Sequence, residues 1–343
     1  MKYSFRNDYS EACHPQILEA LRNNNSGQTD GYGEDPYCAK AAKLIKELSN
    51  QPEADVHFLT GGTQTNLVML SAALRPHESV IATNLAHIST HETGAIEATG
   101  HKINELPTTD GKITPEQVED VVAEHHFEHM VYPKLLFISN TTETGTVYTK
   151  TELQALRTVC DKHGLYLYID GARLGMALTS PANDMSMADM ATLCDAFYIG
   201  GTKNGFLFGE ALVIINPDLQ PHFRYHMKQK GALMAKGRTL GIQFHSMFEN
   251  NLYFDLAEYA NLLAAKLSSG IADLGYNFRY VPESNQIFPI FPNPIIDKMM
   301  EDYGFYVWEK IDKNNSCVRL VLSWASTDEQ VRSFLDDLRK LTK

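Results

Sequence analysis

The sequence has no excess of basic residues and no long apolar run, and these absences exclude several classes of protein. Acidic residues outnumber basic ones by 12 (42 against 30), which argues against a general nucleic-acid-binding protein. No apolar run approaches the roughly 18 residues that a membrane-spanning helix needs. The opening residues, MKYSFRNDYS, lack the apolar core of a signal peptide. With 43% hydrophobic and 21% charged residues, we expect a globular protein of the cytoplasm.

Cysteine pairs and nucleotide-binding motifs are missing as well. The cysteines are odd in number, scattered and without a C-x-x-C pair, so we expect reduced thiols; they are Cys13, Cys38, Cys160, Cys194 and Cys317. Neither G-x-G-x-x-G nor a Walker loop is present, which removes the main support for a nucleotide-binding function. His87 and His91 have a metal-compatible spacing, but no H-E-x-x-H order accompanies them, and we expect no metal.

Short apolar runs alternate with segments of helical period. Six runs are predicted strands buried on both faces, at 54–60, 79–83, 133–139, 165–170, 196–200 and 211–215. Residues 63–75 and 149–164 are predicted helices, the second with Thr151 as N-cap and Gly164 as its stop. This alternation predicts an α/β fold with a mostly parallel sheet and helices on both faces.

The pattern changes near Phe248. From there a long predicted helix at 255–275 leads to apolar segments at 286–292 and 317–324 and to a last helix at 328–341. We therefore predict two domains. Residues 1–248 would form the N-terminal segment and a large domain, and residues 249–343 a smaller C-terminal α/β domain.

Polar residues follow the predicted strands, and ligands of parallel sheets bind outside the carboxyl ends of the strands. After the strand at 54–60 the sequence TGGTQTN opens a helix, whose free backbone N–H groups would suit a phosphate. Asp170 ends one strand and Lys203 follows another, 33 residues later. Both residues should therefore lie at the same edge of one sheet.

Lys203 lies among glycines and aromatic residues in FYIGGTKNGFLFGE. It could be a lysine on a glycine-rich loop whose flanks alone are buried. It could instead be kept partly desolvated, so that its amine is neutral enough to form a Schiff base. With a phosphate-binding helix start, an acid and a histidine in the same layer, pyridoxal 5′-phosphate is the cofactor that needs these parts.

Eight short motifs, in this order, resemble those of the threonine aldolases, which belong to the β-eliminating lyase group of fold type I pyridoxal-phosphate enzymes. The motifs are FRNDYS, GYGEDP, GGTQTN, AHISTHETGA, ISNTTETG, DGARLG, GGTKNG and VRLVLSW. The resemblance runs from Phe5 to the last helix, and YGEDP and DGAR are its more specific parts. It implies an aminotransferase-like fold with a mostly parallel central sheet and a smaller C-terminal α/β domain.

The resemblance also implies how the cofactor is held. Lys203 would be the Schiff-base lysine, Asp170 would pair with the pyridinium nitrogen, and His87 would stack on the ring. The implied phosphate-binding residues are Gly62, Thr63 and Gln64.

For the substrate, the resemblance implies that Arg173 and Arg319 bind the carboxylate, which a planar guanidinium matches with two hydrogen bonds. Arg319 lies in a strand whose Val318, Leu320 and Leu322 should face the opposite side. An exposed strand arginine is the alternative. Tyr32 would reach a neighbouring subunit's site, which implies a homodimer or homotetramer with the active site at the interface.

Two positions depart from the family's motifs. Asn7 replaces a serine near the substrate carboxylate, and Thr142 stands where a histidine would approach the β-hydroxyl of the substrate. A threonine takes up no proton at neutral pH, which leaves His87 as the candidate base.

The expected function is a pyridoxal-phosphate lyase that cleaves the Cα–Cβ bond of β-hydroxy-α-amino acids to glycine and an aldehyde. One alternative is a β-eliminating lyase or racemase acting on another amino acid, which Thr142 would favour. A second is a nucleic-acid-binding use of the fold, based on the basic cluster from Arg224 to Arg238, which could also serve a subunit interface. We expect a small amino acid as partner, and neither nucleic acid nor membrane.

Overall fold

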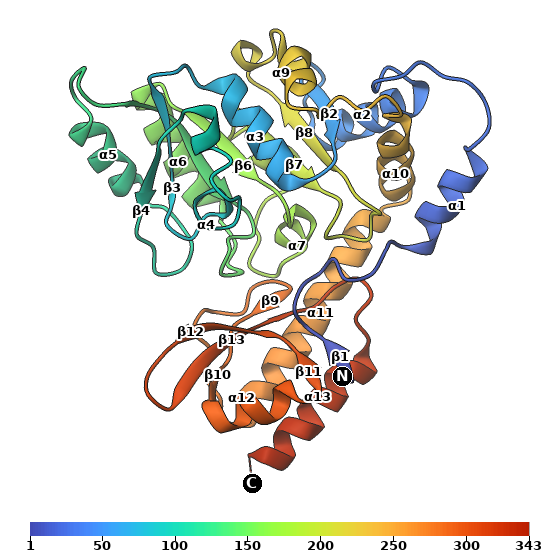
Figure 1. Ribbon diagram of the computed structural model, residues 1–343, viewed down its shortest axis with the longest axis vertical. Coiled ribbons are helices and arrows are strands. Elements are labelled where there is room, and N and C mark those ends of the chain that lie inside the picture. The colour runs from blue at the N-terminus through green and yellow to red at the C-terminus, as the bar shows by residue number, and fades with distance from the viewer. Residues whose placement is uncertain (343) are drawn as a thin grey trace.

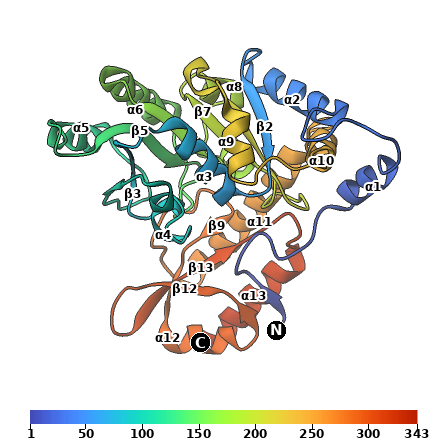
Figure 2. The ribbon, with the colours of Figure 1, turned by 45° about the horizontal axis from the view of Figure 1, so that its top comes forward.

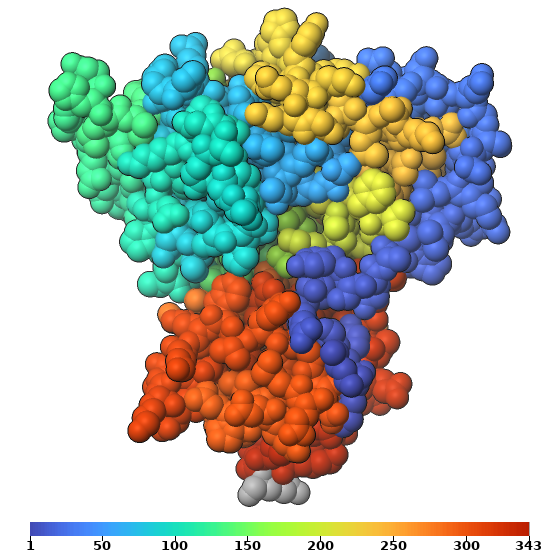
Figure 3. Space-filling model, in the orientation of Figure 1, coloured from blue at the N-terminus to red at the C-terminus, as the bar shows by residue number. Residues whose placement is uncertain are grey.

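Two α/β parts, a large and a small one, make up the protein (Figure 1). The computed structural model describes residues 1–342. The large part surrounds a seven-stranded sheet, and α11 (Leu252–Asp273) runs from it into the small part. A waist separates the two parts in the space-filling view (Figure 3). Along residues 1–342, no helix combines the length and apolar character needed to cross a membrane.

The central sheet has the strand order β2-β8-β7-β6-β5-β3-β4. Its strands are β2 (Asp55–Leu59), β3 (Glu78–Thr83), β4 (Ile103–Leu106), β5 (Tyr132–Ser139), β6 (Tyr166–Asp170), β7 (Ala196–Gly200) and β8 (Glu210–Ile214). Strands β4, β3, β5, β6 and β7 are parallel, whereas β8 pairs antiparallel with both β7 and β2. The carboxyl ends of β2, β5, β6 and β7 therefore meet at one edge, beside the first residue of β8.

This sheet confirms the predicted α/β fold and its six predicted strands, with ends shifted by at most one residue. The edge strand β4 was not predicted, because its sequence, INEL, carries two polar residues and is only four residues long.

Helices cover both faces of the sheet, as Figure 2 shows. One face packs against α3 (Gly62–Ala73) and α9 (Phe223–Gln229) through side chains such as Leu59, Phe137 and Tyr198. The other face packs against α2 (Pro36–Ser49), α6 (Lys150–His163) and α10 (Arg238–Phe248). The remaining helices of the large part are α1 (Pro15–Asn23), α4 (His87–Thr90), α5 (Pro115–Glu124), α7 (Leu174–Leu178) and α8 (Met187–Ala191).

The start of α6 differs from the sequence prediction by two residues. Thr149, not Thr151, is the N-cap: its hydroxyl accepts a hydrogen bond from the Glu152 N–H, while the Glu152 carboxylate accepts one from the Thr149 N–H. Such a reciprocal pair satisfies two otherwise free donors. At the other end, Gly164 has φ 65° and stops the helix, as predicted.

The small part is an antiparallel sheet backed by helices. Strand β13 (Asn315–Val321) pairs with β10 (Ile290–Pro292), β12 (Tyr306–Lys310) and β9 (Gln286–Ile287). Val318, Leu320 and Leu322 are fully buried among residues of α11 and α13 (Asp328–Leu341), as the two-residue period predicts. Helix α12 (Asn293–Met300) and strand β11 (Tyr303–Gly304) complete this part.

The N-terminal strand packs with the small part, although the sequence grouped it with residues 1–248. Strand β1 (Tyr3–Ser4) is parallel to β11, and Phe5 is fully buried in the core of the small part. Both chain ends drawn in Figure 1 lie in this part. This pairing joins residues about 300 positions apart in the chain, which no local pattern can signal.

Candidate active site

A cavity of about 360 Å³ opens between the two parts, at the edge where the carboxyl ends of the parallel strands meet. The large part contributes the segments that follow β2, β3, β5, β6 and β7, the N-terminal segment contributes Tyr9, and the small part contributes Arg319. The lining residues are Tyr9, Thr60, Gly61, Gly62, Thr63, His87, His91, Glu143, Asp170, Ala172, Arg173, Tyr198, Thr202, Lys203, Glu210 and Arg319.

Asp170, the last residue of β6, is held by three hydrogen bonds. Its Oδ1 accepts from the Tyr198 hydroxyl (2.6 Å) and from the Ala172 N–H (3.0 Å). Its Oδ2 accepts from the Asn66 side-chain amide at 3.0 Å. With 3% of its surface exposed, this carboxylate is fixed in one orientation at the floor of the cavity.

Lys203 follows β7 by three residues and lines the same cavity as Asp170. Burial, and then the charge of Arg173, lower the pKa of Lys203, while Asp8, Glu143 and Asp170 act in the opposite direction. Burial disfavours a charged amine, so this lysine reaches the neutral, nucleophilic form more readily than a surface lysine.

The N-terminus of α3 presents free backbone donors to the cavity. Gly61 is its N-cap and no side chain caps the helix, so the N–H groups of the first turn have no internal partner. Gly61, Gly62 and Thr63 all line the cavity. A Cβ on Gly62 would lie 2.9 Å from the Tyr198 hydroxyl oxygen, so the close approach of α3 to β7 requires glycine there.

His87 is held by a buried carboxylate. Its Nδ1 lies 2.8 Å from Glu92 Oε1, and the same oxygen accepts a hydrogen bond from Asn66, which also donates to Asp170. Burial lowers the pKa of His87, but the hydrogen bond to Glu92 and the charges of Glu143 and Asp170 together outweigh it and raise the pKa above the usual value. His91 stacks on His87 with ring centres 5.6 Å apart.

Arg173 forms a buried ion pair with Asp8. Its Nε and Nη2 donate to the two oxygens of Asp8 at 2.7 and 3.1 Å, and Asn285 donates to the same carboxylate at 3.0 Å. Burial lowers the pKa of Arg173, but the charge and hydrogen bonds of Asp8, together with the charge of Glu143, outweigh it and raise the pKa. The guanidinium therefore stays charged, with Nη1 left for a further partner.

Arg319 enters the cavity from β13 without a carboxylate of its own. Its Nη2 donates to the Arg6 backbone oxygen at 3.2 Å, and its guanidinium lies 5.3 Å from the ring centre of Trp308. Burial, and then the charge of Arg173, lower the pKa of Arg319. Within residues 1–342 no acid lies within 4.0 Å of it, so an anionic ligand would complete its charge balance.

Four predicted site residues lie outside the cavity lining. Thr142 is buried, and its hydroxyl is hydrogen-bonded to the Thr146 hydroxyl at 2.7 Å in a turn that packs on Asp110. Gln64 accepts from the Thr60 hydroxyl at 2.7 Å, so its side chain turns back along the chain. Asn7 accepts from the Tyr9 N–H (3.1 Å), and Tyr32 lies in a separate cavity beside Arg224. The other seven predicted residues line the cavity.

Four ionisable side chains line the cavity without having been assigned to it from the sequence. They are Tyr9, His91, Glu143 and Glu210. Glu143 adjoins the predicted Thr142 and Tyr9 is two residues from the predicted Asn7, whereas His91 had been weighed only as a metal ligand. Glu210 begins β8, and the antiparallel direction of that strand, which the sequence did not show, is what brings it to this edge.

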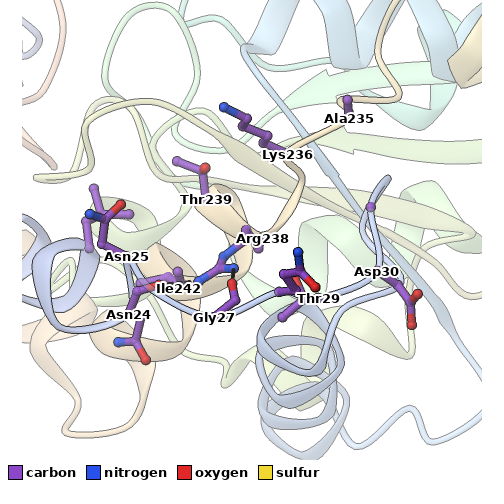
Figure 4. A pocket seen from close by; sticks show the side chains of 13 residues that line it. Asn24, Asn25, Gly27, Thr29, Asp30, Ala235, Lys236, Arg238, Thr239 and Ile242 are labelled. Atoms are coloured by element: carbon purple, nitrogen blue, oxygen red, sulfur yellow. Dashed lines mark hydrogen bonds between the residues drawn. The ribbon is translucent and has the colours of Figure 1, made fainter.

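The basic cluster from Arg224 to Arg238 is partly used within the chain. Arg238 donates to the backbone oxygens of Gly27 (2.8 Å) and Asn24, as Figure 4 shows beside a second cavity of about 840 Å³. Arg224 pairs with Glu34 at 3.0 Å. These contacts hold the 24–34 loop against the segment that carries Arg224 and Arg238.

A mostly parallel sheet, an uncapped helix start, a strand-end aspartate and a loop lysine at one edge define the class of fold type I enzymes. The aspartate aminotransferase of Thermus thermophilus shares this fold, with a TM-score of 0.72 at 16% identity over 99% of this chain and 91% of that one. The predicted fold class is therefore confirmed.

The chain belongs to the β-eliminating lyase family, whose sequence model matches residues 5–291. It is 32% identical over 340 residues to the low-specificity L-threonine aldolase of Pseudomonas aeruginosa, covering 97% of this chain and 95% of that protein. It is also similar to a solved structure of Leishmania major threonine aldolase, with a TM-score of 0.98 and 51% identity over 99% of this chain and 100% of that chain. These similarities confirm the resemblance that the motifs indicated.

Proposed function

We propose that the protein is a pyridoxal-phosphate-dependent lyase that cleaves the Cα–Cβ bond of threonine-type β-hydroxy-α-amino acids to glycine and an aldehyde. The two threonine aldolases named above support this reaction, because this chain matches them over almost the whole length of both chains. The observation that supports it most strongly is that Lys203 lies in one cavity with Asp170 and the α3 N-terminus and has a lowered pKa.

The residues present fit this cofactor. The free N–H groups at the start of α3, which lines the cavity through Gly62 and Thr63, suit its phosphate. The fixed carboxylate of Asp170 suits the pyridine nitrogen, and the Lys203 amine would hold the cofactor covalently. When bound, the cofactor supplies an electron sink for the pair of electrons left on Cα.

The two arginines suit the carboxylate of the substrate. Arg173 keeps Nη1 after its bonds to Asp8, and Arg319 brings a cation without a carboxylate partner from the opposite side of the cavity. Two planar guanidinium groups orient a carboxylate as well as attract it. In this role they select amino acids and fix which bond at Cα faces the electron sink.

The proton of the β-hydroxyl needs an acceptor, and we assign this role to His87. Thr142 is turned away from the cavity, whereas His87 lines it and is oriented by Glu92 through Nδ1, which leaves Nε2 as the acceptor. Because the pKa of His87 is raised, its neutral, accepting form needs a higher pH than that of an ordinary histidine.

Replacement of Lys203 tests the proposed function directly. Purified protein with pyridoxal phosphate should show the visible absorbance of a lysine-bound cofactor, and Lys203→Ala should lose both this band and nearly all formation of glycine and aldehyde. Lys298→Ala, a surface lysine paired with Glu301, is the control and should retain both.

The products separate the alternative reactions. Ammonia and a keto acid in place of glycine and an aldehyde would make the protein a β-eliminating lyase, and inversion at Cα alone would make it a racemase. Wild-type protein that gains no visible band with added pyridoxal phosphate would remove the proposal altogether.

A further inference from the structure

Glu210 is a buried acid that the proposed reaction does not use. It is the first residue of β8, 4% exposed, and it lines the same cavity as Lys203 and Asp170. Its backbone is in register with Gly200 of β7 and with Leu59 of β2. Because β8 runs opposite to both neighbours, its first residue lies where β7 and β2 end.

Two contacts fix the Glu210 side chain beside the lysine segment. Its Oε2 accepts a hydrogen bond from the Gly201 N–H at 2.9 Å, and the Thr202 hydroxyl is also hydrogen-bonded to it. On the other side, Leu59 is three residues from Gly62, the first residue of α3. Glu210 therefore lies in the corner between Lys203 and the helix start that would bind phosphate.

The ionisable groups that face Glu210 come from four elements. Lys203 follows β7 and Asp170 ends β6, and the charge of Glu210 acts on three buried tyrosines: Tyr168 of β6, Tyr198 of β7 and Tyr253 of α11. Burial, only partly opposed by hydrogen bonds and by Lys203, raises the pKa of Glu210 to about 7, and Asp170 adds to the rise. Near neutral pH this carboxyl is therefore present in both forms.

A bound phosphate would add negative charge to a corner that already holds Asp170. An ionised Glu210 would repel it across a buried cavity, where charges are weakly screened. A protonated Glu210 removes that repulsion. Building on the proposed function, we propose that Glu210 makes cofactor binding proton-linked: its carboxyl is neutral when the cofactor is held, and its ionisation weakens binding.

The test measures binding rather than turnover. Pyridoxine 5′-phosphate has the ring and phosphate of the cofactor but no aldehyde, so it binds without reacting with Lys203. Its dissociation constant for cofactor-free protein is measured by calorimetry between pH 6.5 and 9. The affinity of the wild-type protein should fall as the pH rises. This fall should be steeper than in Glu210→Gln by up to about tenfold per pH unit, which corresponds to one linked proton.

Glu78→Gln is the matched control. Glu78 is also a buried glutamate at the first residue of a strand, but it begins the parallel strand β3 and so lies at the opposite edge of the sheet. Its variant should keep the wild-type slope. Equal slopes for wild type and Glu210→Gln would overturn the inference.

Stability of the cofactor-free protein gives a second measurement. A carboxyl whose pKa rises on folding contributes stability below its unfolded value, near 4.5, and that contribution is lost as the pH rises through about 7. From pH 5 to 8.5, wild type should therefore lose stability relative to Glu210→Gln in urea unfolding. A constant difference would count against the inference.

The outcomes separate the inference from the proposed function. If pyridoxal phosphate binds and the pH slopes of wild type and variant agree, the inference alone fails. If pyridoxal phosphate binds at no pH, the proposed function fails, and the inference with it. Should Glu210→Gln not fold, proton uptake by wild type is read from calorimetry in two buffers of different ionisation enthalpy, and no net uptake at pH 8 overturns the inference.

Discussion

At the scale of single residues, the partner of each side chain decides what it can do. His87 and His91 stack on each other, yet their pKa values move in opposite directions: Glu92 raises that of His87, whereas burial lowers that of His91. Glu92 is itself held by Asn66, which also donates to Asp170. The buried side-chain amide of Asn66 thus connects the partner of His87, the proposed base, with Asp170, which is proposed to pair with the pyridine nitrogen of the cofactor.

Replacement of Glu92 should move the pH dependence of the reaction. A base works in its neutral form, so kcat/KM should rise with pH and level off above the pKa of His87. Glu92→Gln removes the charge that raises this pKa, and the rise should shift by about one unit or more toward lower pH. Glu97→Gln, an exposed neighbour, should leave the profile unchanged. A profile that does not move in Glu92→Gln would exclude His87 as the titrating base.

Replacement of Arg319 should affect the substrate more than the cofactor. Arg319→Lys keeps a charge but loses the planar fork, and a charge-assisted hydrogen bond contributes about 1.5–3 kcal/mol. We expect kcat/KM to fall by about ten- to a hundred-fold, with the cofactor dissociation constant little changed. Loss of the cofactor with KM unaltered would instead place Arg319 at the phosphate.

At the scale of elements, the N-terminal segment connects the two parts across the cavity. It pairs with β11 through β1, and the Phe5 oxygen accepts from the Val321 N–H at 3.0 Å. Three residues later in this segment, Asp8 binds Arg173 of the large part and Asn285 of the small part. The segment therefore sets the position of Arg173, which we propose binds the substrate carboxylate, while belonging to the small part.

Asp8→Asn should weaken both this connection and the activity. The Arg173 and Asp8 side chains are 8% and 0% exposed, and removal of one partner from a buried ion pair costs about 3 kcal/mol or more. We expect a matching loss in urea unfolding and at least about a tenfold fall in kcat/KM, with cofactor absorbance retained. Glu309→Gln breaks the exposed pair with Arg279 and should change stability by less than about 1 kcal/mol. Equal effects of the two variants would show that Asp8 has no special role.

At the scale of the whole molecule, Tyr32 does not line the candidate active-site cavity of its own chain. Tyr32 has φ 58°, is 43% exposed, and lies with its ring 4.7 Å from the Lys228 nitrogen. The family resemblance implies that this residue reaches the site of a neighbouring subunit. We therefore propose that the protein is at least a homodimer, in which each site takes Tyr32 from the other copy.

Mixing two inactive variants tests this assembly. Lys203→Ala and Tyr32→Ala should each have little activity alone. When the two are unfolded and refolded together, one site of each mixed pair is intact and activity should return. Light scattering should give a multiple of 38.5 kDa. A monomeric mass, or no recovery on mixing, would rule out a shared site.

The sequence by itself determined the features that rest on local periodicity. Buried parallel strands are short apolar runs, so the strands at β3, β5, β6 and β7 and the sheet edge that carries Asp170 and Lys203 could be predicted. The αL stop at Gly164 was local too. The N-cap is Thr149 and not the predicted Thr151, because both threonines are followed three residues later by Glu or Gln and so satisfy the same pattern. Motif order was enough to indicate the family.

Tertiary structure alone decided which side chains face the cavity. Thr142 and Glu143 are adjacent in the chain, yet packing of the turn on Asp110 directs the threonine inward and leaves the glutamate at the cavity. The reversed direction of β8 brings Glu210 beside Lys203, and pairing across the whole chain brings β1 and Asp8 to Arg173. These contacts join residues far apart in sequence, and their energies depend on burial and charge that exist only once the chain has folded.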